Sequence, residues 1–183
     1  RHRMTLHFGI LTISDRSARG ERADLSGPAL ADFVRARGWL ASLLDVVADD
    51  RAQIASTLTG WCARGDLDVI LTTGGTGFGP RDQTPEGTKV VLDREAPGIA
   101  EAMRLVNPLG RLSRGVAGTR GLALVLHTPG SSRGAGETVE AVLDVIAVTR
   151  SEVLSHRVSL RTQLATGLPL IGGDRVQVQQ VVL

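Results

Sequence analysis

The sequence predicts an α/β protein, a three-layer αβα sandwich in which helices cover both faces of a mostly parallel sheet. Short apolar stretches rich in β-branched residues alternate along the chain with stretches that have helical periodicity. The 183 residues suit one domain, and 42% hydrophobic with 22% charged residues is ordinary for a globular protein. Strands and helices that alternate at this spacing build parallel βαβ units, which places the sheet between two helical layers.

The predicted strands cover residues 6–13, 39–47, 69–72 and 122–126, and residues 112–119 are expected to be extended. The predicted helices cover residues 26–37, 49–64, 85–93, 98–106 and 137–154. Residues 14–25 and 129–136 are polar and contain glycine, so we expect loops there. We expect one domain over residues 4–160 and a C-terminal extension over 161–183. In that extension, the alternation of residues 175–182 (RVQVQQVV) predicts an edge strand or a disordered tail.

One stretch, DVILTTGGTGFGPRDQTPE at residues 68–86, carries most of the functional information. A buried strand runs into a loop with four glycines in six positions, and the loop leads to a helix with Thr84 as its expected N-cap and Pro85 as its first residue. Backbone amides and the helix dipole at such a turn form an anion site. No Gly-Lys-Ser/Thr closes it, and the glycine spacing does not match the dinucleotide fingerprint. From spacing alone, a phosphate cradle and a packing turn remain equal alternatives.

The loops that follow parallel strands meet at the carboxyl edge of the sheet. We therefore expect residues 14–16, the glycine loop and the loop from Pro129 to border one pocket. Asp82 follows the glycine loop, where its carboxylate would hold magnesium or simply pair with Arg81. Asp49 ends the second strand at the same edge, and from the residues alone a helix N-cap is the favoured interpretation.

Other polar residues at this edge have two interpretations each. Thr73 and Thr76 would donate hydroxyls to a phosphate or cap local turns. Ser14 and Asp15 would border the ligand or fix the loop after the first strand. The arginines Arg81, Arg114 and Arg133 would contact anions or remain surface charges. His127 lacks neighbours with metal-ligand spacing, so no metal role is expected. A Ser-His-Asp triad stays open, although the sequence contains no G-x-S-x-G elbow.

Charge and composition argue against several classes of partner. The net charge is only +2, and the pI of about 9.4 arises because all basic residues except Lys89 are arginines. The arginines are scattered and aromatic residues are few, so we expect no nucleic-acid partner. No apolar run approaches 18 residues, so we expect no membrane partner. Cys62 is the only cysteine, which fits a reducing compartment, and we expect a cytoplasmic protein.

The string TTGGTGFGPRDQTPE resembles the signature loop of the molybdopterin-binding family, which includes the bacterial molybdopterin adenylyltransferases and the N-terminal domain of gephyrin. The similarity covers roughly residues 6–155. Further segments resemble family motifs in the same order, namely ISDR at 13–16, DLSGP at 24–28, REAPG at 94–98, LSR at 112–114, GTRG at 118–121 and TPGS at 128–131. Several separate motifs in one order make a chance match improbable.

The resemblance implies the molybdopterin-binding fold and a specific reaction, the transfer of AMP from MgATP to molybdopterin with release of pyrophosphate. It implies Asp49 and Asp82 as catalytic residues and as ligands of Mg²⁺. It also implies a homotrimer and a molybdenum insertase as a partner. The expected ligand-binding residues are Ser14, Asp15, Thr73, Gly74, Gly75, Thr76, Gly77, Arg81, Ser113, Pro129, Gly130 and Ser131.

Two alternatives belong to other functional classes. One is a non-catalytic protein that binds molybdopterin, and the presence of both Asp49 and Asp82 argues against it. The other is a paralogue that acts on another phosphorylated ligand. The second loop favours the paralogue, because Thr128 replaces the family's usual Leu and Ser132 replaces its Lys or Pro.

Overall fold

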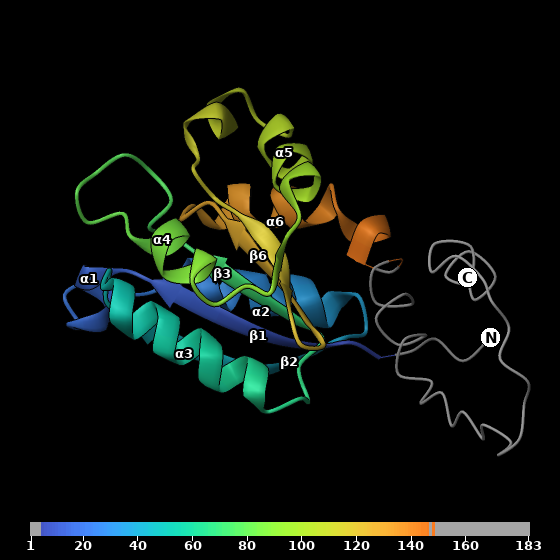
Figure 1. The fold of residues 1–183 in the computed structure, drawn as a ribbon. Coiled ribbons are helices and arrows are strands. Elements are labelled where there is room, and N and C mark those ends of the chain that lie inside the picture. The colour runs from blue at the N-terminus through green and yellow to red at the C-terminus, as the bar shows by residue number, and fades with distance from the viewer. Residues whose placement is uncertain (1–4, 147, 149–183) are drawn as a thin grey trace, which may run out of the picture.

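A six-stranded sheet with the strand order β2-β1-β3-β6-β5-β4 forms the middle layer of the protein (Figure 1). The computed structural model describes residues 5–146 and 148. β1 pairs in parallel with β2 and β3, and β3 pairs in parallel with β6, whereas β5 and β4 extend the sheet in antiparallel fashion. The strands are β1 (His7–Ile13), β2 (Leu40–Val47), β3 (Val69–Thr73), β4 (Arg94–Glu95), β5 (Ala117–Arg120) and β6 (Ala123–Thr128).

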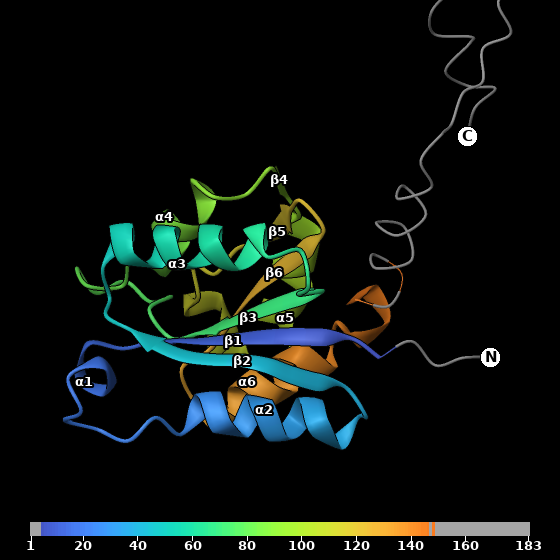
Figure 2. The same cartoon turned by 90° about the horizontal axis from the view of Figure 1, so that it is seen from below.

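Helices cover both faces of this sheet. One face carries α2 (Ser26–Ala36), α5 (Pro97–Leu105) and α6 (Ser132–Glu140), and the other carries α3 (Arg51–Ala63) and α4 (Thr84–Lys89). Figure 2 shows α3 and α4 on one side of the strands and α2 and α6 on the other. The predicted three-layer sandwich is therefore confirmed. Two short elements, α1 (Asp15–Ala18) and the 3₁₀ helix η1 (Pro108–Leu112), lie in its loops. No helix in the described ranges is long and apolar enough to cross a bilayer.

Alternation along the central strands divides the core into two clusters. In β1, Phe8 and Ile10 face the cluster under α2, α5 and α6, whereas Leu11 and Ile13 face the cluster under α3 and α4. All five residues of β3 and all six of β6 are buried. Strands covered on both faces are mostly apolar at successive positions, which explains the continuous apolar runs in the sequence.

Local side-chain hydrogen bonds explain two wrong predictions at the ends of elements. Residues 14–25 contain the short helix α1, because Ser14 Oγ accepts a bond from the Ser17 amide and caps it. Thr84 is not an N-cap but the first residue of α4, and its hydroxyl donates to the Gly74 carbonyl at 3.0 Å.

Three further differences concern the second half of the chain. The two-residue strand β4 was missed, since nothing local distinguishes it from a loop. Residues 112–119 are not extended throughout, because η1 ends at Leu112 before β5 begins. α6 starts at Ser132, five residues earlier than predicted, because Ser131 caps it. The predicted helical continuation to residue 154, the extension at 161–183 and the alternating segment at 175–182 lie outside the described residues.

Candidate active site at the carboxyl edge of the sheet

The loops that follow β1, β3 and β6 meet at one edge of the sheet, as predicted. Ser14 N donates to Val47 O at 2.9 Å and so joins the loop after β1 to the end of β2. Thr73 Oγ1 donates to Pro129 O at 2.7 Å and joins the loops after β3 and β6. These bonds place the glycine loop in the middle of the rim. They also occupy the Thr73 hydroxyl, which is fully buried.

Two glycines give the glycine loop its shape. Gly74 has a φ of 98° and Gly75 a φ of 63°, a region that L side chains rarely adopt. A Cβ atom on Gly74 would collide with the backbone oxygen of Ile13, and one on Gly75 would collide with the hydroxyl of Thr84. The loop is fastened to α4, because Thr84 N donates to Gly75 O at 3.1 Å.

Arg114 holds the outer half of the glycine loop from the segment before β5. Its Nε donates to Gly77 O at 2.6 Å, its Nη2 donates to Asp82 O at 2.6 Å, and its guanidinium pairs with Glu86. The Arg114 guanidinium lowers the pKa of the Glu86 carboxyl. Arg114 is therefore not a solvated surface charge, because its guanidinium is bonded to the loop and to Glu86. Arg133 is also paired, with Glu137 one turn along α6 at 2.9 Å.

Asp49 points a carboxylate oxygen at the glycine loop. Its Oδ2 accepts a bond from the Asp15 amide at 2.9 Å, and its Oδ1 lies 2.8 Å from the position of a Cβ on Gly75. The N-cap of α3 is the neighbouring residue, Asp50, whose Oδ1 accepts from Gln53 N at 2.8 Å. The interpretation of Asp49 as an N-cap was therefore wrong, and Oδ1, the oxygen that the Asp15 amide does not hold, lies beside the glycine loop.

Asp82 lies on the other side of the same loop. Its Oδ2 accepts a bond from the Gly79 amide at 2.7 Å and lies 2.8 Å from the position of a Cβ on Gly77. The predicted alternative, a pair with Arg81, is wrong because the Arg81 guanidinium turns to Asp15. Two carboxylates therefore border the glycine loop, Asp49 beside Gly75 and Asp82 beside Gly77.

The environment of Asp49 disfavours its negative charge. Burial raises the pKa of Asp49, the Asp15 amide opposes this by stabilising the anion, and the charges of Asp15 and Asp82 raise the pKa further. The Arg81 guanidinium acts in the opposite way on Asp15 and lowers its pKa. A cation bound beside Asp49 would offset this burial and repulsion.

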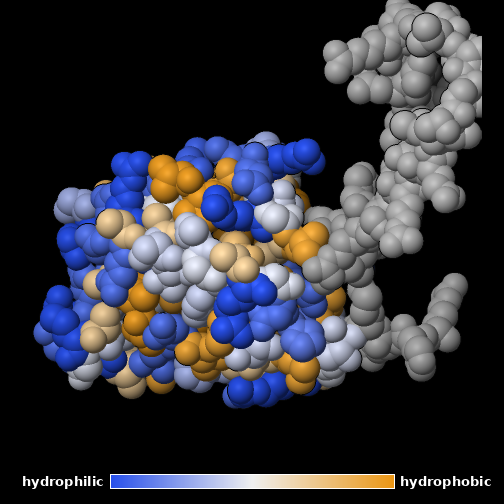
Figure 3. All heavy atoms as spheres, turned by 60° about the horizontal axis from the view of Figure 1, so that its bottom comes forward, coloured by the Kyte–Doolittle hydropathy of each residue, from blue (hydrophilic) through white to orange (hydrophobic). Residues whose placement is uncertain are grey.

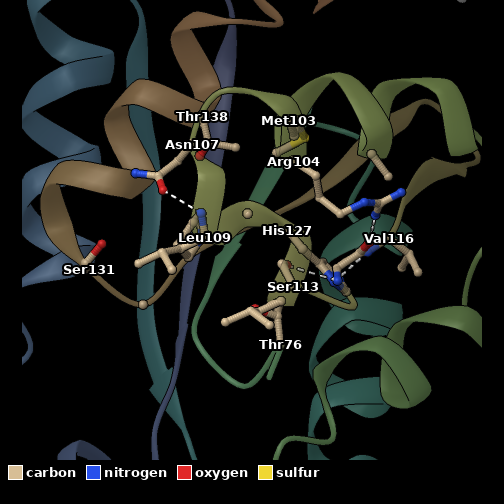
Figure 4. Close-up of a pocket in the computed structure, with 16 residues that line it drawn as sticks. Thr76, Met103, Arg104, Asn107, Leu109, Ser113, Val116, His127, Ser131 and Thr138 are labelled. Carbon is tan, nitrogen blue, oxygen red and sulfur yellow. Dashed lines mark hydrogen bonds between the residues drawn. The ribbon is translucent and has the colours of Figure 1, made fainter. Parts of the chain in front are cut away.

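The larger of two pockets at this rim, about 270 Å³, is lined by both apolar and polar side chains (Figure 4). Met103, Leu109 and Val116 are among its apolar residues. A smaller and more polar pocket of about 150 Å³ borders Asp24 and Arg22. Of the predicted ligand-binding residues, the larger pocket contains Thr76, Ser113, Pro129, Gly130 and Ser131, and the smaller contains Ser14, Thr73, Gly74 and Gly130. Asp15, Asp49, Gly75, Gly77, Arg81 and Asp82 line neither pocket.

His127 lines the larger pocket and serves the fold. Val116 N donates to its Nδ1 at 3.2 Å, so the proton is on Nε2, which donates to Thr88 Oγ1 at 2.7 Å. Burial lowers the pKa of His127 to about 3, so the ring is neutral at physiological pH. Because both ring nitrogens are used, a Ser-His-Asp triad built on His127 is excluded.

The described residues contain no group of three or more His, Cys, Asp and Glu side chains that could hold a metal ion. Magnesium in phosphate chemistry is commonly held by one or two carboxylates together with the phosphates of the substrate. Within residues 5–146, no hydrogen bond reaches Asp49 Oδ1 or Asp82 Oδ1. The pair therefore fits a magnesium ion that arrives on a phosphate ligand.

Sequence reasoning missed the part of the larger pocket that comes from α5 and η1. Met103, Arg104 and Asn107 line it, although they are far in sequence from the glycine loop (Figure 4). Asn107 caps η1 by accepting from Leu109 N at 2.8 Å, and the Asn-Pro step that signals this turn was the one local sign. Asp24 was also missed, and at the start of α2 it accepts from the amides of Ser26 and Gly27 at 3.1 Å.

A mostly parallel α/β sheet with a glycine loop and two carboxylates at its carboxyl edge is typical of proteins that bind a ligand at that edge. The sequence matches a family model described as "Probable molybdopterin binding domain" over residues 9–167. The chain belongs to this family, as the resemblance predicted.

Individual relatives agree with the family match. The chain is 38% identical over 150 residues to a molybdopterin adenylyltransferase of Helicobacter pylori, an alignment that covers 78% of this chain and 84% of that protein. It is 38% identical over 152 residues to the molybdopterin adenylyltransferase of Escherichia coli K12, covering 76% and 75%. The crystal structure of the molybdopterin biosynthesis enzyme MoaB from Thermus thermophilus is similar, with a TM-score of 0.75 and 44% identity over 80% of this chain and 98% of that one.

Proposed function

We propose that this protein is a molybdopterin adenylyltransferase, which transfers AMP from MgATP to molybdopterin. An oxygen of the terminal phosphate of molybdopterin forms a bond to the α-phosphorus of ATP. The bond from that phosphorus to the bridging oxygen breaks, and pyrophosphate leaves with the electron pair. No water, oxidant or reductant enters the balance.

The observation that carries this proposal is the pair of carboxylates that border the glycine loop. Asp49 Oδ1 lies beside Gly75, and Asp82 Oδ2 lies beside Gly77 and Gly79. Two reacting phosphates need a bound cation and hydrogen-bond donors. The two carboxylates would bind the cation, and the backbone amides of the loop would donate the hydrogen bonds. Two relatives that are 38% identical to the chain are named molybdopterin adenylyltransferases.

Each predicted site residue has a place in this proposal. The amides of the glycine loop cradle phosphate oxygens, and Asp49 and Asp82 would hold the magnesium of MgATP or orient the attacking phosphate. The ring systems of the ligands would enter the larger pocket, which Thr76 lines, and the smaller pocket, which Gly74 lines. Six of the remaining predicted ligand-binding residues line these pockets, namely Ser14, Thr73, Ser113, Pro129, Gly130 and Ser131. Asp15 and Arg81 line neither pocket and lie beside Asp49. In-line transfer of this kind depends mainly on positioning and charge neutralisation.

A pyrophosphate-release assay tests the proposal. With MgATP and molybdopterin together we expect release of pyrophosphate, and with either substrate alone we expect none. Binding of molybdopterin without pyrophosphate release would identify a non-catalytic binding protein. Absence of binding would favour a paralogue with another phosphorylated ligand.

The structure weakens the reason for the paralogue alternative. Thr128 is 1% exposed, and its hydroxyl donates to Thr72 O at 2.9 Å. The residue that differs from the family's Leu therefore lies inside the sheet and does not line either pocket. Ser132, the other departure, is the first residue of α6.

Chelation of magnesium should abolish the reaction. Asp49 and Asp82 carry charge that must be balanced when two phosphates approach them, and the described residues supply no third carboxylate to bind the ion without substrate. We expect that EDTA stops pyrophosphate release and that excess Mg²⁺ restores it. Turnover that continues in chelator would exclude a metal role for the two aspartates.

We also propose a homotrimer, as the family resemblance implies. On the face in Figure 3, apolar residues form several small groups separated by hydrophilic ones. At the end of α5 and in η1, Leu105 and Leu109 are 73% and 71% exposed, which supplies apolar area for an interface. Light scattering at micromolar concentration should give a mass near three chains, and a monomeric mass would contradict the proposal.

The cellular setting completes the proposal. The adenylyltransferase domain spans residues 4–160, with residues 161–183 as an extension. A molybdenum insertase would take up the adenylylated product. The substrates and the single, half-buried Cys62 fit a cytoplasmic location.

A further inference from the structure

Asp15 forms a bridge between the two halves of the proposed transfer site. On one side, Arg81 donates from Nε to Asp15 Oδ2 at 2.9 Å and from Nη2 to Asp15 Oδ1 at 2.8 Å. On the other side, Asp15 N donates to Asp49 Oδ2 at 2.9 Å, and Asp49 N donates to Asp15 Oδ1 at 3.1 Å. Arg81 directly precedes Asp82 in the chain, so the bridge connects the segments that carry both proposed catalytic carboxylates.

The carboxylate of Asp15 is already used by the protein. Its Oδ1 accepts two bonds and its Oδ2 accepts one, and the side chain is 21% exposed. Its negative charge would also repel a phosphate that is not shielded by Arg81. These contacts favour a role toward other residues over direct contact with a ligand.

The exchange of bonds with Asp15 fixes the direction of Asp49. Because Asp49 Oδ2 is held by the Asp15 amide, rotation of the carboxylate would break that bond. The other oxygen, Oδ1, consequently stays directed at Gly75. The two parallel bonds from Arg81 to Asp15 act in the same way on the segment that carries Asp82. Together they fix both the distance and the orientation of the Arg81 guanidinium relative to the Asp15 carboxylate.

We propose that Asp15 is a positioning residue of the transfer reaction: it directs Asp49 Oδ1 at the glycine loop and, through Arg81, fastens the segment that carries Asp82. The role rests on the proposed adenylyl transfer. In a reaction driven by alignment, a misplacement of about 1 Å in one group can lower the rate by about 10²-fold.

The Asp15→Asn variant tests this role, because it keeps the size of the side chain and removes its charge. We expect kcat to fall by about 10- to 10²-fold while the Kd for molybdopterin, measured by calorimetry, stays unchanged. The matched control is Asp66→Asn. Asp66 accepts a similar fork from Arg64, at 3.0 and 2.8 Å, but precedes β3 at the opposite edge of the sheet. This control should keep the parent kcat.

A second variant approaches the bridge from its other end. Arg81→Lys keeps the positive charge but cannot form the two-bond fork. We expect kcat to fall, and we expect the double variant Asp15→Asn/Arg81→Lys to lose no more than Asp15→Asn alone, because both changes break the same fork between Arg81 and Asp15. Losses that multiply in the double variant would overturn the proposal.

The remaining outcomes separate Asp15 from the wider function. A weaker molybdopterin Kd with the parent kcat would make Asp15 a ligand contact, and Asp15→Asn kinetics equal to those of Asp66→Asn would remove its role. Both outcomes overturn the proposal.

Backbone amide NMR without substrates supplies an independent readout, in which the resonances of Asp49 and Asp82 should move in Asp15→Asn but not in Asp66→Asn. If they do not move, the bridge is refuted. If the parent chain transfers no AMP, the proposed function fails, and this measurement still decides the bridge.

Discussion

Replacing either carboxylate beside the glycine loop, by Asp49→Asn or Asp82→Asn, is expected to lower the adenylylation rate by about 10²–10³-fold. A loss of this size corresponds to roughly 3–4 kcal/mol of transition-state stabilisation, the amount typical for one well-placed electrostatic group. Single-turnover adenylylation gives the rate, and calorimetry gives molybdopterin binding, which should survive.

The structure explains why these variants should fold normally. In Asp49→Asn, the amide oxygen can still accept the bond from Asp15 N, which turns the NH₂ group toward the glycine loop. In Asp82→Asn, the amide oxygen can still accept from Gly79 N. Each variant therefore keeps its anchor and loses the charge that faces the reacting phosphates.

Asp50→Asn is the matched control for this pair. Asp50 is the neighbour of Asp49 and the N-cap of α3, and Asn caps a helix nearly as well as Asp. This variant should match the parent chain in both stability and turnover. Parent-like turnover of both Asp49→Asn and Asp82→Asn would show that the active site has been assigned wrongly.

Gly75→Ala is expected to damage stability, binding and turnover together. The φ of 63° costs a residue with a Cβ atom about 1–2 kcal/mol. The new methyl group would also collide with the Thr84 hydroxyl and lie 2.8 Å from Asp49 Oδ1. To make room, α4 or Asp49 must shift, so the glycine loop loses its cradle and one carboxylate loses its position.

Gly65→Ala separates the cost of the positive φ angle from the cost of the collision. Gly65 has a φ of 72°, and a Cβ atom there would have no neighbour within 4 Å. It should therefore show the backbone cost alone, about 1–2 kcal/mol in urea unfolding, with parent-like turnover. Equal effects of Gly65→Ala and Gly75→Ala on stability and activity would contradict a role for the close approach at Gly75.

Much of the fold and the place of the site could be predicted from the sequence. β1, β3 and β6 are signalled by continuous apolar runs, and the parallel order that follows from strand–helix alternation brings their loops to one rim. The same reasoning placed Asp49 and Asp82 at that rim before any side-chain geometry was known. Periodicity and topology are sufficient to place these strands and loops, because the placement depends only on the direction of the backbone.

The details that sequence reasoning got wrong depend on contacts between distant residues. Asp49 and Asp50 have the same side chain and both precede α3, and only the approach of Asp15 shows which of them caps the helix. Arg114 resembles any surface arginine until it meets the carbonyls of Gly77 and Asp82. No local pattern encodes these partners, because they lie more than 30 residues away along the chain.

The transfer of AMP to molybdopterin is tested most directly with ATP labelled in its α-phosphate. In a single turnover with excess enzyme, magnesium and molybdopterin, the account predicts that the label moves to the pterin and that one pyrophosphate is released for each labelled product. The Asp82→Asn variant should form the same product more slowly. Label that stays in ATP, or that is recovered as free AMP or ADP with no labelled pterin, would contradict the account.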